Sequence, residues 1–198
     1  MSLLVSRMNP HFTFNTISSI QSYILKNEKE QAIKYLSDFG SLIRKTLDYS
    51  YIDYIKISEE VSFLNLWVSL ENKRFAQGYS LSVTHKEETL DSKIPALLLQ
   101  PIIENVFKHA IYPQSDQKLI HININEEKHY LVLTVEDGGI SKTKKDQQEN
   151  HNSVGLKIVK DRIKQHNGND FENQDFSITK NTLTANTGFK VTIKLLKK

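Results

Sequence analysis

The sequence predicts an α+β protein in which an N-terminal helical hairpin is followed by an α/β sandwich. Apolar residues recur at helical spacing up to about residue 76, and they alternate at strand spacing in several segments after residue 79. Strands and helices are mixed in the second part, which favours one sheet with helices packed on one face. We therefore expect two domains, residues 1–78 and residues 79–198.

Two helices joined by a short turn account for most of the first fifty residues. The first, over residues 11–25, has an apolar stripe made of Phe14, Ile17, Ile20, Ile24 and Leu25. The second, over residues 30–50, repeats the spacing through Ile33, Leu36, Phe39, Ile43 and Leu47. The polar stretch KNEKE between them suits the turn of a helical hairpin. A third helix follows, with Ser58 as its predicted cap, and it ends near Gly78.

The second part is predicted to contain five strands and two helices. Pro101 predicts a kink in the first of these helices. In the second, Val154, Ile158 and Ile163 are expected to face inward. The polar, glycine-led segment 138–153 is predicted to be a mobile loop. The helices are expected over 94–111 and 154–167, and the strands over 79–85, 118–125, 129–137, 175–181 and 188–196.

Composition excludes several classes of function. The chain has 198 residues, a net charge of +3 and no cysteine, so disulfides, thiolate metal sites and cysteine nucleophiles are ruled out. There is no run of five like charges, and this does not favour nucleic-acid binding. No apolar stretch reaches the roughly 18–20 residues needed to span a bilayer. We expect a cytoplasmic fragment whose membrane segments would lie upstream.

Four short motifs could carry chemistry, and each also has a plain structural interpretation. In MNPHFTFN, the neutral ring of His11 could attack phosphorus, or His11 could be an ordinary surface histidine. In ENVFKHA, Asn105, Lys108 and His109 share a helix face. The Asn105 amide oxygen could ligate Mg²⁺ and its neighbours could meet phosphate, or this could be a solvated polar face.

The other two motifs contain glycines. In VEDGG, a strand ends at Asp137, whose carboxylate could accept a hydrogen bond from an adenine amino group. An ordinary Asp-Gly turn is the alternative. In SVGLKIVKDRI, Gly155 opens a helix, and free N–H groups at a helix start suit phosphate, although one glycine is weak support.

Taken together and in this order, the four motifs resemble the bacterial sensor histidine kinases of the LytS-like group, whose phosphoacceptor motif is Pro-His-Phe-x-Phe-Asn. The resemblance extends from about Leu4 to the C-terminus. It implies a dimerisation and phosphoacceptor hairpin followed by a Bergerat-type ATP-binding domain of the kind shared with gyrase and Hsp90. It also implies ATP and Mg²⁺ as cofactors, a homodimer, and a response regulator as the partner that accepts the phosphoryl group on an aspartate.

The resemblance assigns roles to particular residues. It makes His11 the residue that takes the γ-phosphoryl group, and Asn105 the ligand of Mg²⁺. It places Lys108 and His109 near the nucleotide, Asp137 and Gly139 at the adenine, and Gly155 and Leu156 beside the phosphates. The segment from Ser141 to Asn152 corresponds to an ATP lid.

Departures from the family pattern keep two alternatives open. Ser141 and Ser153 stand where the family has glycine, which motivates a degenerate dimeric scaffold or nucleotide sensor. A Bergerat-fold ATPase would need a glutamate four residues before Asn105, and the sequence has Pro101 there. We expect the joint between the two domains near Gly78, because His11 and the nucleotide belong to different domains.

Overall fold

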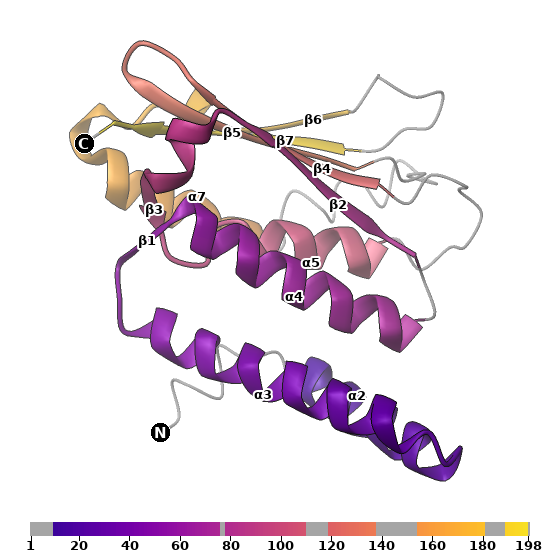
Figure 1. Ribbon diagram of the computed structural model, residues 1–198. Coiled ribbons are helices and arrows are strands. Elements are labelled where there is room, and N and C mark those ends of the chain that lie inside the picture. The colour runs from indigo at the N-terminus through magenta and orange to yellow at the C-terminus, as the bar shows by residue number, and fades with distance from the viewer. Residues whose placement is uncertain (1–9, 76–77, 110–118, 138–153, 181–188, 198) are drawn as a thin grey trace.

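The computed structural model describes residues 10–75, 78–109, 119–137, 154–180 and 189–197. Its elements form three layers in Figure 1: a sheet, a layer of helices on one of its faces, and a helical hairpin packed below. In chain order they are α2 (Pro10–Leu25), α3 (Lys29–Ser50), β1 (Tyr54–Lys56), α4 (Ile57–Phe75), β2 (Ser80–His85), η1 (Glu87–Asp91), β3 (Lys93–Pro95), α5 (Gln100–His109), β4 (Leu119–Glu126), β5 (Tyr130–Asp137), α7 (Val154–Asn167), η2 (Gly168–Asp170), η3 (Asn173–Asp175), β6 (Phe176–Lys180) and β7 (Phe189–Leu196).

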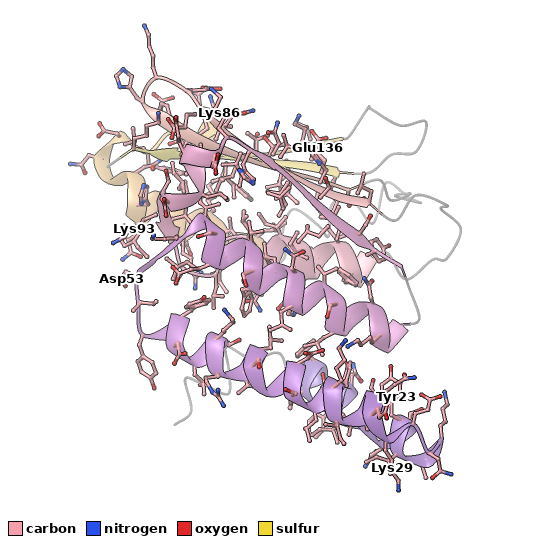
Figure 2. All side chains as sticks on the ribbon, in the orientation of Figure 1. Tyr23, Lys29, Asp53, Lys86, Lys93 and Glu136 are labelled. Atoms are coloured by element: carbon pink, nitrogen blue, oxygen red, sulfur yellow. The ribbon has the colours of Figure 1, made fainter. Side chains whose placement is uncertain are left out.

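The five-stranded sheet has the order β2-β4-β5-β7-β6. Strands β2 and β4 are parallel, and the other pairs are antiparallel. Burial alternates along β4 and β7, so one face packs on helices and the other meets solvent. On the solvent face, Lys190 forms an ion pair with Glu136 at 2.7 Å, and Figure 2 shows Glu136 on that side. The predicted α+β class and all five predicted strands are confirmed.

The hairpin packs on α4 through a face that overlaps the predicted apolar stripes only in part, since Ile20 and Phe39 of these stripes pack against the core. Phe12 is buried between Phe39 and Trp67, and the Tyr35 hydroxyl donates to the Leu70 carbonyl at 3.3 Å. Lys73 pairs with Asp38 at 3.0 Å. The predicted stripes remain largely outside this contact: their exposed members are Phe14, Ile17, Ile24, Leu25, Ile33 and Leu36.

Helix α4 links the hairpin to the sheet domain because it contacts both. It packs on α2 and α3 on one side and on β2 and α5 on the other. The predicted cap at Ser58 is wrong, since α4 already begins at Ile57. The Glu59 carboxylate instead accepts the Lys56 N–H at 2.8 Å and satisfies a donor at the helix start.

Two predictions for the helices of the second part are wrong. Helix α5 begins only at Gln100, so Pro101 lies in its first turn, where proline is tolerated, and the expected internal kink is absent from this helix. Helix α7 has its predicted bounds, but it buries Leu156, Val159 and Ile163, whereas Val154 is 77% exposed and Ile158 is also exposed. The predicted loop over 138–153 lies outside the described residues.

A short connector joins the hairpin to the remainder of the chain. Residues 51–53 lead directly into β1, which pairs with β3 in a two-stranded sheet that the sequence did not predict. Tyr23 and Lys29 lie near the tip of the hairpin, and Figure 2 shows Asp53 of the connector at the opposite end.

Candidate functional site

Asn105 lies on α5 and is only 4% exposed. It follows Pro101 by four residues, so the two lie on the same face of the helix. A buried amide on a helix face otherwise occupied by apolar side chains is held in place by its surroundings. Its oxygen is a suitable ligand for a hard cation.

The start of α7 comes very close to this face of α5. Gly155 is the second residue of α7, and a Cβ atom placed on it would lie 3.2 Å from the Cβ of Pro101. A side chain at this position would push the helices apart, so the glycine permits their close approach. Leu156 is buried beside it. The contact brings the segments that carry Gly155 and Asn105 together.

Asp137 is the last residue of β5 and is 7% exposed. Burial raises the pKa of the Tyr79 hydroxyl above its ordinary value, and the charge of Asp137 adds to this effect. The Tyr79 ring lies 4.8 Å from the Phe107 ring of α5. Asn72 fixes the Tyr79 backbone through two hydrogen bonds, of 2.6 and 2.9 Å. Tyr79 therefore packs against the helix that carries Asn105, and the charge of Asp137 at the end of β5 reaches its hydroxyl.

A row of aromatic rings extends from Phe12, the residue after His11, to this region. Phe12 stacks on Trp67 with ring centroids 6.0 Å apart, and Trp67 meets Phe107 edge-on at 5.1 Å. Phe107 then contacts Tyr79. Phe12, which follows His11 in the sequence, is thus linked through packed rings to Tyr79.

Four predicted site residues are only partly described or lie outside the described residues. His11 is the second residue of α2, and Lys108 and His109 are the last two residues of α5; the structure describes their backbone but not their side chains. Gly139 lies outside the described residues, as does the segment predicted to be a lid. Their roles stay predictions.

The donor set fits a metal site that depends on phosphate. Within the described residues there is no group of three or more carboxylate or histidine side chains that could hold a metal ion. Mg²⁺ commonly takes one or two protein oxygens and completes its coordination with waters and substrate phosphates. The single amide of Asn105 fits this second kind of site.

Sequence reasoning missed the buried residues that support the site. Tyr79 and Trp67 gave no signal, because their role depends on contacts between segments far apart in the chain. Glu60 lies in the first turn of α4, where an acidic residue is ordinary at an exposed helix start, yet it is fully buried. The one signal in the sequence was the position of Glu60 on the same helix face as apolar residues such as Ile57 and Leu64.

Comparison with known proteins identifies the family. Residues 91–198 match the family described as histidine kinase-, DNA gyrase B-, and HSP90-like ATPase. The chain belongs to this family. Residues 1–79 match a second family model, described as histidine kinase. These matches confirm the predicted resemblance and the Bergerat-type class of the sheet domain.

Curated relatives are sensor proteins of the predicted group. Sensor histidine kinase BtsS of Escherichia coli K12 is 28% identical over 172 residues, which cover 86% of this chain and 30% of that protein. Sensor protein LytS of Enterococcus faecalis is 29% identical over 69% of this chain and 23% of its own length. Sensor histidine kinase YesM of Bacillus subtilis is 29% identical over 70% of this chain and 24% of its own. The chain therefore spans less than a third of the length of these relatives.

Proposed function

We propose that this chain is the kinase core of a two-component sensor histidine kinase. It transfers the γ-phosphoryl group of ATP to His11 and then to an aspartate of a response regulator. The observation that supports this most strongly is the contact of Gly155 with Pro101, one turn from the buried Asn105. The two family matches, one for each half of the chain, agree with it.

Asn105, Asp137 and Gly155 would hold ATP and Mg²⁺ together with residues whose roles come from the family resemblance. The Asp137 carboxylate would accept a hydrogen bond from the adenine amino group, and Gly139 would let the base approach the backbone. The helix start at Gly155 and Leu156 would offer N–H groups to phosphate, with Lys108 and His109 nearby. Asn105 would hold Mg²⁺, which when bound neutralises charge on the phosphates.

Transfer needs little covalent help from the protein. A ring nitrogen of His11 would form a bond to the γ-phosphorus while the bond from that phosphorus to the bridging oxygen of ADP breaks. Positioning and charge neutralisation supply most of the lowering of such barriers. The role of this chain is therefore to bring the His11 ring nitrogen up to the γ-phosphorus, in line with the bond that breaks.

The exposed stripes of the hairpin support a homodimer. Phe14 is 70% exposed, and the exposed apolar side chains of α2 and α3 repeat at helical spacing. Exposed apolar stripes of this kind favour burial against a second copy, and two hairpins would give a four-helix bundle. We also propose that residues 1–78 form the dimerisation and phosphoacceptor region and residues 79–198 the ATP-binding domain.

We propose that this kinase core works on the cytoplasmic side of a membrane sensor. Within the described residues, no helix is long and apolar enough to cross a bilayer.

Incubation of the purified chain with γ-labelled ATP and Mg²⁺ tests the proposal. We expect label on the wild type and none on His11→Gln, while both variants bind a fluorescent ATP analogue equally. Label on His11→Gln at the wild-type level would refute the assignment of His11. Failure of the wild type to bind the analogue would favour the alternative of a degenerate scaffold, which the serines at 141 and 153 motivate.

A further inference from the structure

A fully buried carboxylate holds the turn before α5. Glu60 lies on α4 with no exposed surface. Its Oε2 atom accepts the N–H of Leu97 at 2.9 Å, and its Oε1 atom accepts the N–H of Leu99 at 2.9 Å. Both donors lie just before the first residue of α5, so the carboxylate satisfies N–H groups that the chain offers at a helix start.

This turn needs to be held because its backbone is strained. Leu97 has a φ of 55°, in the left-handed region that residues with a side chain rarely adopt. The neighbouring Ala96 is fixed from two further elements. Its carbonyl accepts a hydrogen bond from Arg162 of α7, and its N–H donates to the Asp53 carbonyl of the connector at 2.9 Å. Strained backbone of this kind persists when the surroundings over-determine it, and it clusters near functional sites.

Glu60 and Arg162 connect three helices at this turn. Burial raises the pKa of Glu60 to about 7, while its backbone hydrogen bonds and the charge of Arg162 act in the opposite direction. On the hairpin side, Tyr49 of α3 also interacts with the Glu60 charge. Burying a carboxylate carries a large desolvation cost, so stability alone gives little reason for a charge here.

We infer that Glu60 is a positioning residue for nucleotide binding, with Arg162 as its partner. The carboxylate fixes the turn over residues 96–99, which leads into α5, to α4, and Arg162 fixes the same turn to α7. The start of α5 is therefore locked relative to the start of α7, and this sets how Asn105 and Gly155 face a common nucleotide. The inference rests on the proposed function, because it concerns the site that would hold ATP.

The test compares binding of a fluorescent ATP analogue to the 198-residue chain and its variants. Glu60→Ala and Glu60→Gln remove one or both acceptors, and we expect each to weaken binding about tenfold, as the loss of a charge-assisted hydrogen bond would. Glu60→Asp keeps both oxygens and should recover part of the affinity. Amide exchange at Leu97 and Leu99, followed by NMR, should speed up in Glu60→Gln.

Leu42→Ala is the matched control. Leu42 is buried on α3, and the hydrogen bonds that hold the turn come from Glu60, Arg162 and Asp53, so we expect this variant to lose stability without changing the start of α5. Its affinity for the analogue should stay within about twofold of the wild type. Wild-type affinity in Glu60→Gln, despite faster exchange at Leu97, would overturn the inference, and so would an equal loss in Leu42→Ala. Absence of binding by the wild type would instead refute the proposed function.

Discussion

Replacing Glu60 with glutamine should change how stability depends on pH. The pKa of Glu60 is about 7 in the folded chain against an ordinary 4.5, so the folded state holds this proton more tightly than the unfolded state. Protonation therefore stabilises the fold. That contribution is fully present below pH 4.5, and it is lost as the pH rises through 7. From pH 5 to pH 8 the loss amounts to about 2–3 kcal/mol, at 1.36 kcal/mol for each pH unit over which the two states differ.

Urea denaturation of wild type and Glu60→Gln at several pH values measures this effect. Glutamine does not titrate, so the wild type should lose about 2–3 kcal/mol relative to Glu60→Gln between pH 5 and pH 8. Leu42→Ala should be destabilised by the same amount at every pH. A difference between wild type and Glu60→Gln that does not vary with pH would refute the reasoning, because the buried carboxyl would then titrate as it does in the unfolded chain.

Three further substitutions test the packing of the site. Trp67→Ala removes the ring between Phe12 and Phe107 and should lower the free energy of unfolding by about 3–5 kcal/mol in urea; a loss under about 1 kcal/mol would contradict the packed aromatic row. Gly155→Val forces a side chain against Pro101, and this overpacking should lower the free energy of unfolding by about 1–3 kcal/mol. The same variant should bind a fluorescent ATP analogue more weakly, and unchanged affinity would contradict the proposed role of this contact in nucleotide binding. Asp137→Asn removes the proposed adenine acceptor and should weaken the same binding about tenfold or more in a fluorescence titration, with wild-type affinity counting against this role.

Regular elements with strong periodicity could be predicted from the sequence. Residues 154–167 form a helix with the predicted bounds. Apolar residues recur at helical spacing from Val154 to Ile163, and Asn167 and Gly168 then mark the end of the helix. The inward residues were misjudged, since the face that packs depends on where α5 and β7 lie. Leu156 and Val159 are buried in place of Val154 and Ile158.

The turn over residues 96–99 could not be predicted. Its apolar run suits a helix, and the groups that hold it come from other segments. Glu60 accepts the N–H of the left-handed Leu97, while Arg162 and Asp53 bond to the backbone of Ala96. The candidate site was likewise predictable only in part, because its geometry depends on contacts between distant segments. The motifs located Asn105, Asp137 and Gly155 by resemblance, whereas the contact between Gly155 and Pro101 comes from tertiary packing.

Mapping the phosphorylated residue tests the central claim most directly. The wild-type chain would be incubated with ATP and Mg²⁺, digested at neutral pH to preserve acid-labile phosphate, and analysed by mass spectrometry. We predict phosphate on the peptide that contains His11 and on none of the other six histidines of the sequence. Phosphate on His109 or another residue, or no phosphate on a chain that binds ATP, would contradict the account.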